Sequence, residues 1–288
     1  MANQKQIKKR VTSVKNVGRI TSALGMVAAS KVQIAQDKAL NTKPYAEKVY
    51  ELVSAFRNES GLAISHPLLR KPEKIDNALI ILVSTNKGLV GSLNIQLFSK
   101  FSEYMKESGV KKYFFSTIGS KEVSFAIVHG ELIADFSETT SEDDKLPAVV
   151  NLIITEFVDR KVDAVYLVYS EFLTVMNYES KIEQLFPIVY ESGDGKKETK
   201  SGFVFEPSPE EVLESLMTFY IETQVRNAIY ESEASEFAAR MVSMKNASDN
   251  AIELSDALNV EYNKARQQAI TDEISDVVTS AESMAKRI

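Results

Sequence analysis

The most enzyme-like residues in this chain form a glycine turn, NKGLVGSLN, at residues 86–94. Gly88 and Gly91 lie between a predicted strand and a predicted helix, and Ser92 is a candidate N-cap. A glycine turn at a helix N-terminus can hold phosphate with its backbone N–H groups. The spacing matches neither G-x-G-x-x-G nor G-x-x-x-x-G-K-[ST], and paired glycines in such turns are common for steric reasons alone. We therefore favour a structural turn, with nucleotide binding as the alternative.

Other residue types used in catalysis are scarce or poorly spaced. The chain has no cysteine and only two histidines, His66 and His129, which argues against thiolate and multi-histidine metal sites. Its acid pairs are Asp143–Asp144, Glu210–Glu211 and Asp272–Glu273. Neighbouring residues on a helix point in different directions, and acids near a helix start favour its dipole. No catalytic triad can be assembled, so we predict no catalytic residue, no metal and no cofactor.

Composition narrows the class of protein further. The net charge of −6 argues against a dedicated nucleic-acid binder. The longest apolar runs, such as Ala78–Val83, fall far short of the ~20 residues that span a membrane as a helix. Residues 1–31 carry seven Lys/Arg and no acid, a composition that overlaps a mitochondrial targeting peptide or an interfacial helix. The helical spacing continues past residue 31, which favours a structural helix instead.

The last 79 residues, 210–288, contain neither glycine nor proline, the residues that most strongly interrupt helices. Apolar and small residues recur there at intervals of three and four, which is helical spacing. A helix this long with one apolar stripe needs a partner helix to bury that stripe. The stripe includes Met241, Met244, Ala251, Leu254, Leu258 and Tyr262.

The predicted partner is the other end of the same chain. Residues 1–43 lack proline and carry a stripe of their own: Ile7, Val11, Val14, Val17, Ile20, Leu24 and Val27. Residues 1–58 hold eleven Lys/Arg and three Asp/Glu, whereas residues 210–288 hold seven and fifteen. Opposite net charges favour the pairing, as flanking charges do in coiled coils. We expect Val14, Leu24, Met241, Met244, Leu254 and Leu258 to lie in the seam.

Between these helices the sequence alternates between strand and helix patterns. Strands are predicted at 78–85, 112–118 and 163–170, and helices at 95–107, 119–128 and 146–160. Residues 172–188 are predicted to add an antiparallel edge strand. This alternation is typical of an α/β domain with a mainly parallel sheet. The fold class is thus α/β: a small Rossmann-like domain (75–206) inserted between an N-terminal helix with its linker (1–74) and a C-terminal helix (207–288) that form an antiparallel coiled coil.

Several segments, in matching order, resemble the γ subunit of F-type ATP synthase. They are RITSALGMVAASK (19–31), STNKGLVGSLN (84–94), IGSK (118–121), IEQLFP (182–187), ARMVSMKNASDNA (239–251) and YNKARQQAITDEISDVV (262–278). The resemblance covers essentially the whole chain. It implies a non-catalytic rotor, the central stalk that couples ion flow to ATP synthesis or hydrolysis on the β subunits.

The resemblance also implies partners and contact residues. The partners would be the α and β subunits, the ε subunit and the membrane ring of c subunits, with no nucleic acid and no small-molecule substrate. Arg240, Arg266, Gln267, Thr271 and Lys87 would face the β subunit. A foot near ε and the c-ring would contain Lys43, Pro44, Tyr45, Phe203, Phe205 and Glu206.

The chain departs from the family pattern in places. Asn86–Lys87 stands where the family usually has Asp–Arg, and the cysteine-bearing insert of plastid relatives is absent. We therefore expect no thiol control and a bacterial protein on the cytoplasmic face of the plasma membrane, using H⁺ or Na⁺. Two alternatives stay open: a nucleotide-binding enzyme with helical arms, and a coiled-coil scaffold that binds DNA through its basic first helix.

Overall fold

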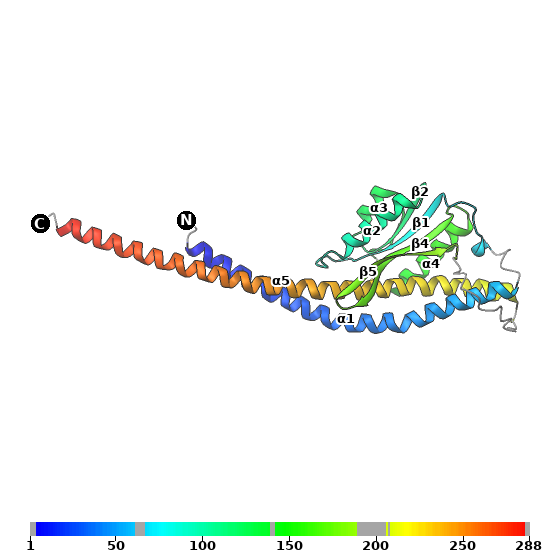
Figure 1. Ribbon diagram of the computed structural model, residues 1–288, viewed down its shortest axis with the longest axis horizontal. Helices are drawn as coiled ribbons and strands as arrows, with labels where there is room; N and C mark the ends of the chain where they lie inside the picture. Colours follow the sequence, from blue (N-terminus) through cyan, green and yellow to red (C-terminus); the bar gives the residue numbers. More distant parts are fainter. Residues whose placement is uncertain (1–3, 61–66, 139–141, 189–205, 207, 286–288) are drawn as a thin grey trace. The chain divides into compact units, whose positions relative to one another are not determined.

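The computed structural model describes residues 4–60, 67–138, 142–188, 206 and 208–285. It forms two compact units, one from the chain up to Ala28 together with the chain from Met241 onward, the other from Ala29–Arg240. The elements (Figure 1) are α1 (Gln4–Ser60), η2 (Pro67–Leu69), β1 (Asn77–Val83), α2 (Leu93–Glu107), β2 (Lys112–Ile118), α3 (Val123–His129), β3 (Glu131–Asp135), α4 (Glu142–Val158), β4 (Ala164–Thr174), β5 (Asn177–Phe186) and α5 (Pro209–Ala285). Both units contain parts of α1 and α5.

The larger unit is built on a five-stranded sheet of order β3-β2-β1-β4-β5. Strands β1 to β4 are parallel, and β5 pairs antiparallel with β4 along the edge, as the sequence predicts. The predicted α/β class is therefore confirmed. Strand β3 is not among the predicted strands because it is only five residues long and half-exposed, so it shows no apolar run.

Strand β1 explains why its sequence is a continuous apolar run. Helices cover both faces of the sheet, so every β1 residue from Ala78 to Val83 is buried. Alternate side chains enter two separate cores. Leu79, Ile81 and Val83 pack with residues of α1, α4 and α5. Ala78, Ile80 and Leu82 pack with residues of α2 and α3, including Phe101 and Ala126.

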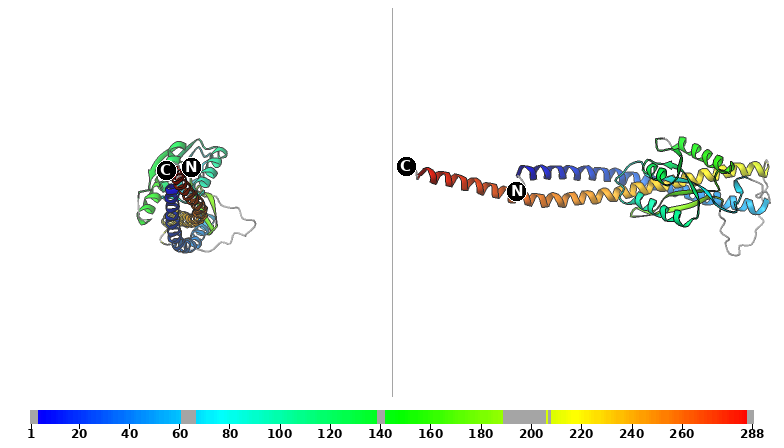
Figure 2. Two further views of the ribbon diagram at one scale, coloured as in Figure 1. Left: turned by 90° about the vertical axis from the view of Figure 1, so that its left-hand side faces the viewer. Right: turned by 90° about the horizontal axis from the view of Figure 1, so that it is seen from above.

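In the smaller unit, the first part of α1 runs beside α5 in the opposite direction, and the last part of α5 continues beyond the start of α1 (Figures 1 and 2). Gln4 Nε2 donates to Tyr262 Oη at 3.4 Å, and Ser248 Oγ donates to the Gly18 carbonyl at 3.4 Å. The contact surface is made of small and mid-sized residues, since Ile7, Val11, Ala28, Met244, Ala251 and Ser255 are its buried members.

Two of the predicted seam residues do not lie in the seam. Met244 is buried and Val14, Met241 and Leu258 are half-buried. Leu24 is 39% exposed and Leu254 is 51% exposed, so the seam prediction is wrong for them.

The reason is helical geometry. At about 100° per residue, each step of three residues turns the stripe by about 60°. The three consecutive steps from Val11 to Ile20 therefore carry the predicted stripe to the far side of α1. The glycines Gly18 and Gly25 lie on the true line of contact. On α5, Ser255 stays in line with Ala251, whereas Leu254 is rotated away from it.

We predict different outcomes for alanine at the two seam glycines. A Cβ on Gly25 would meet the Met244 Cβ at an ordinary 3.5 Å, whereas a Cβ on Gly18 would meet the Ala251 Cβ at 3.2 Å. Gly25→Ala should raise the free energy of unfolding by about 0.5–1 kcal/mol, the helix-propensity gain. Gly18→Ala should gain clearly less, because the neighbouring helix must shift. Urea unfolding followed by far-UV circular dichroism measures both, and a larger gain for Gly18→Ala would contradict the seam geometry.

A buried carboxyl group lies at the start of α3. Glu122 is fully buried, and its Oε2 accepts a hydrogen bond from Ser84 Oγ at the end of β1. Burial raises the pKa of Glu122 to about 8, although the backbone N–H groups of Glu122 and Ser84 oppose this shift. The carboxyl group is therefore largely protonated at neutral pH.

This shift predicts a stability that falls as pH rises. Between the ordinary Glu value of 4.5 and about 8, only the folded state holds the Glu122 proton, so unfolding becomes easier with increasing pH. The slope should approach about 1.4 kcal/mol per pH unit within that window. Glu122→Gln should remove this contribution. Unfolding midpoints at pH 5 to 8 test it, and a difference between variant and parent that is the same at every pH would rule it out.

Candidate functional site

The predicted contact residues Arg240 and Lys87 are brought together at the glycine turn. Arg240 Nη2 donates to the Lys87 carbonyl at 3.1 Å and to the Gly88 carbonyl at 3.3 Å. The same nitrogen pairs with Glu236 Oε1, one helical turn earlier, at 2.6 Å. Arg240 thus ties α5 to the turn after β1, while the Lys87 side chain itself is exposed.

The turn has an unusual backbone that this contact supports. Leu89 has φ 65° and Gly91 has φ 60°, both in the left-handed region. A leucine in that region costs of the order of 1–2 kcal/mol. Next to it, Val90 is buried against Ala239 of α5. The turn is therefore attached to α5 at two points, a buried apolar contact and the Arg240 hydrogen bonds.

Side chains at the turn form hydrogen bonds to other groups of the protein. Asn94 Nδ2 donates to Thr85 Oγ1 at 2.8 Å, and Ser92 makes no side-chain cap hydrogen bond to α2. Burial raises the pKa of Glu236, and Arg240 opposes that rise. The geometry is that of a structural clasp between turn and helix, which we call the Arg240 clasp: Arg240, Glu236 and the carbonyls of Lys87 and Gly88.

The other predicted β-facing residues lie on the end of α5, in the smaller unit. Arg266, Gln267 and Thr271 are all exposed, and Thr271 Oγ1 donates a hydrogen bond to the Gln267 carbonyl of its own helix, at 2.9 Å. Every residue from 270 to 281 is exposed, including the apolar Ile274, at 59%. This segment has its whole circumference available for contact.

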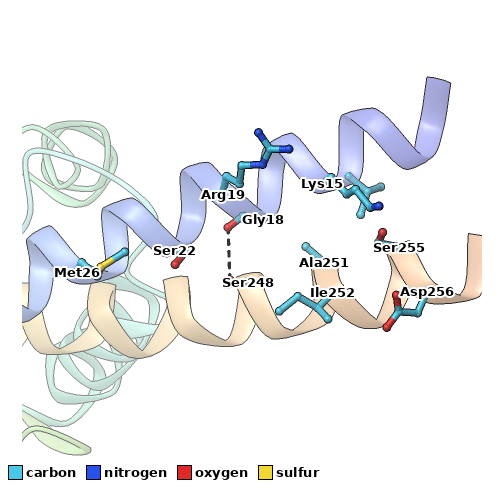
Figure 3. Close-up of a pocket in the computed structure, with 11 residues that line it drawn as sticks. Lys15, Gly18, Arg19, Ser22, Met26, Ser248, Ala251, Ile252, Ser255 and Asp256 are labelled. Atoms are coloured by element: carbon cyan, nitrogen blue, oxygen red, sulfur yellow. Dashed lines mark hydrogen bonds between the residues drawn. The ribbon is translucent and has the colours of Figure 1, made fainter. Parts of the chain in front are cut away.

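The same unit has a groove between its two helices (Figure 3). It encloses about 550 Å³ and is lined by Gly18, Arg19 and Met26 on one side and by Ala251 and Ser255 on the other. The groove exists because the seam residues are small. They let the two helix backbones approach each other, but their side chains are too short to fill the space beside the contact line.

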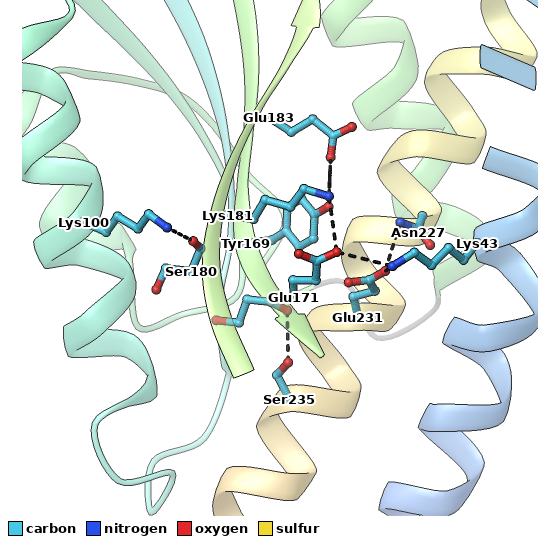
Figure 4. A network of polar contacts seen from close by, with 11 residues as sticks. Lys43, Lys100, Tyr169, Glu171, Ser180, Lys181, Glu183, Asn227, Glu231 and Ser235 are labelled. Carbon is cyan, nitrogen blue, oxygen red and sulfur yellow. Dashed lines mark hydrogen bonds and ion pairs between the residues drawn. The ribbon is translucent and has the colours of Figure 1, made fainter. Parts of the chain in front are cut away.

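Of the predicted foot residues, Lys43, Pro44 and Tyr45 are exposed on α1, and Glu206 is also exposed. Phe203 and Phe205 lie outside the described residues. Lys43 takes part in a polar network that the sequence does not reveal (Figure 4). Its Nζ lies 3.4 Å from Glu171 Oε1 on β4 and 3.9 Å from Glu231 Oε1 on α5.

Strand β5 continues this network. Lys181 Nζ lies 3.4 Å from Glu171 Oε1 and 3.4 Å from Glu183 Oε2, and Tyr169 Oη donates to Glu183 Oε2 at 2.9 Å. The network joins α1, β4, β5 and α5, which are distant in sequence.

Sequence reasoning missed Glu236, Glu171 and Glu231. A signal existed for Glu236, because Glu and Arg four residues apart pair on a helix. Nothing local pointed to Glu171 or Glu231, whose partners are far away in the chain. In the part of the chain that the structure describes, no cluster of His, Cys, Asp or Glu could hold a metal ion. Among the same residues, no helix has the length and hydropathy needed to cross a bilayer.

Comparison with known proteins gives a consistent result. A family model for ATP synthase matches residues 3–284. A chain of the Euglena gracilis mitochondrial ATP synthase (OSCP/F1/c-ring, rotational state 3) has TM-score 0.67 and 19% identity, covering 98% of this chain and 94% of that one. A chain of the rotor of the same organism's enzyme, rotational state 1, has TM-score 0.61 and 20% identity, covering 93% and 98%.

A chain of the Tetrahymena thermophila mitochondrial ATP synthase central stalk and c-ring has TM-score 0.58 and 22% identity, covering 80% of this chain and 99% of that one. At such low identities these structures show only that the fold is shared. Membership of the family rests on the match to the family model. With 282 of its residues spanned by the family model, the chain belongs to the γ-subunit family of F-type ATP synthases, the family of the rotor's central stalk.

Proposed function

We propose that this chain is the rotor shaft that carries rotation between a membrane ring of c subunits and a catalytic head of α and β subunits. It makes and breaks no bond itself. The similar structures come from assemblies described as OSCP/F1/c-ring and central stalk/c-ring, which supports these partners. The alternatives of an independent nucleotide-binding enzyme or a DNA-binding scaffold find no comparable support.

The observation that carries this proposal is the exposed apolar end of α5. Ile270, Ile274, Val277 and Val278 are all exposed, on a segment whose every residue from 270 to 281 is exposed. A single helix in water is marginal unless it packs against something. A surface of this kind is typical of a segment that another protein surrounds, and the bore of the catalytic head would do so.

The contact sites follow from the same proposal. Arg266, Gln267 and Thr271 would meet the β subunit directly, because all three are exposed on α5. Arg240 would act by positioning, since its guanidinium is already engaged by Glu236 and by the turn. Lys87, exposed beside it, would make the contact to the head. Lys43, Pro44, Tyr45, Phe203, Phe205 and Glu206 would form the foot toward ε and the c-ring.

We further propose that the chain works at the cytoplasmic face of a bacterial plasma membrane, as a peripheral subunit. The coupling ion would be H⁺ or Na⁺, a choice made by the c-ring and not by this chain. The resemblance without a plastid-type insert supports this assignment.

Charge placed on the apolar end of α5 should disrupt assembly. Ile274→Asp puts an unpaired carboxylate where the bore would remove water, so affinity for the α/β head should fall about tenfold or more. The adjacent Ser275→Asp is the matched control, because Ser275 is polar and also exposed. Co-purification of tagged chains with α and β, followed by ATPase assay, gives the readout. Equal assembly of both variants, or a parent chain that retains no α or β, would overturn the rotor assignment.

The Arg240 clasp predicts a stability effect in the chain alone. Arg240→Ala leaves the largely buried Glu236 without its cation and two carbonyls without a donor, so unfolding should become easier by about 1–3 kcal/mol. The control is Arg226→Ala on the same helix. Arg226 pairs with Glu222 in a more exposed i,i+4 pair, and its loss should cost less than about 1 kcal/mol.

Urea unfolding of the two variants compares them directly. If both lose the same stability while only Arg240→Ala lowers ATPase coupling in the assembled complex, Arg240 contacts a partner directly and the positioning role is wrong.

A further inference from the structure

A polar cleft lies in the larger unit between α1, β5 and α5, and the rotor function does not account for it. It encloses about 770 Å³. Its lining includes the carboxylates of Glu47, Glu51, Glu183 and Glu231, together with the amino groups of Lys43 and Lys181. We call it the acidic cleft.

Carboxylates outnumber cations in and beside the acidic cleft. Glu171 lies beside the acidic cleft and forms ion pairs with both lysines that line it. Lys43 Nζ and Lys181 Nζ are each 3.4 Å from Glu171 Oε1. Glu51 is paired with Lys48 at 2.6 Å. Five carboxylates thus face three ammonium groups, and in the part of the chain that the structure describes Glu47 has no ion pair. An unbalanced negative site of this kind favours a cation.

The titration of the neighbouring groups agrees with this negative potential. Burial by itself lowers the pKa of Lys181, but Glu183, Glu171 and Glu231 raise it above its ordinary value. Burial raises the pKa of Tyr169, and the same carboxylates raise it further.

The floor of the cleft holds two buried acceptor atoms that lack a partner. Glu231 is 3% exposed and Asn227, one helical turn earlier, is 7% exposed. Among the described residues, nothing donates a hydrogen bond to Glu231 Oε2 or to Asn227 Oδ1. Asn227 Nδ2 donates to Glu231 Oε1 at 3.4 Å, which fixes the amide so that Oδ1 is the free atom. Buried polar atoms are nearly always hydrogen-bonded, so this pair requires a donor.

The missing partner must donate hydrogen bonds, because both free atoms are acceptors. An ammonium group is such a donor, and its charge is opposite to that of the surrounding carboxylates. Lys43 does not fill the role, since its Nζ lies 3.9 Å from Glu231 Oε1 and is bonded to Glu171. The Lys43 side chain is partly exposed at the edge of this network (Figure 4).

We propose that the acidic cleft binds a linear polyamine. One ammonium group would donate to Glu231 Oε2 and Asn227 Oδ1 on the floor, and another would pair with Glu47 or Glu183 at the rim. The carboxylates come from α1, β5 and α5, so a chain with separated charges reaches more of them than a compact ion does. The acidic cleft shares Lys43 with the foot proposed for the rotor, whereas Glu47, Glu183, Asn227 and Glu231 are not among the proposed rotor contacts.

Calorimetric titration of the full chain with spermidine at low salt tests the proposal. We expect saturable binding of one spermidine per chain. Glu231→Gln should weaken it about tenfold or more, by removing a charge-assisted hydrogen bond. Glu47→Gln, an exposed rim change that leaves the fold intact, should also weaken it. Glu214→Gln, an exposed acid elsewhere on α5, is the matched control and should bind as the parent does.

Other outcomes would overturn the proposal. Absence of saturable binding, or an equal loss in Glu214→Gln, would mean that spermidine meets only diffuse surface charge. If MgCl₂ displaces bound spermidine as effectively as putrescine does at equal ionic strength, the binding is likewise to diffuse surface charge. Equal affinity for Nα-acetyl-lysine amide and spermidine would show that the cleft takes a single ammonium group, as on a protein side chain, and not a polyamine.

Discussion

The smaller unit depends on how closely two helix backbones approach each other. Gly18 and Gly25 on α1 face Ala251 and Met244 on α5, and these small contacts set the distance between the helices. Such a seam buries little apolar area per residue compared with a leucine-rich coiled coil. Larger apolar side chains are consequently left on the outside, among them Val17, Ile20, Met26 and Val27 on α1. A thin pair of helices with an apolar exterior suits a shaft that other subunits enclose.

The larger unit is stabilised in a different way. Its sheet is covered on both faces, and β1 contributes to both cores. It also contains buried carboxyl groups at Glu122, Glu231 and Glu236. Burial raises the pKa of each, because the charged form loses its hydration. Glu236 has a close cationic partner, Arg240 at 2.6 Å, whereas the Lys43 amino group lies 3.9 Å from Glu231. The larger unit therefore combines an apolar core with buried carboxyl groups whose ionisation lowers the stability of the fold.

The sequence predicted the elements well because their signals are local. A run without glycine or proline identified α5, and an uninterrupted apolar run identified β1. Alternation of strand and helix patterns was enough for the parallel sheet and its antiparallel edge. The direction in which an apolar stripe faces is harder to predict from the sequence, because one additional spacing of three residues turns the stripe by about 60° around the helix. The stripe therefore predicts Leu24 and Leu254 in the seam, whereas the structure has Gly18 and Ser255 there. Contacts such as Lys43 with Glu231, 188 positions apart, leave no local trace at all.

The Arg240 clasp has a mechanical consequence for a shaft. Backbone hydrogen bonds hold a helix to itself, but they do not attach it to the sheet beside it. For rotation to pass between α5 and the α/β domain, side chains must resist slippage at a definite point. Within the larger unit, the hydrogen bonds of Arg240 to the turn and the buried contact of Val90 with Ala239 supply such a point. A charge-assisted bond to two carbonyls is directional, whereas apolar contacts slide with little penalty. The clasp is therefore better suited than the apolar packing around it to hold the register of α5 against the sheet.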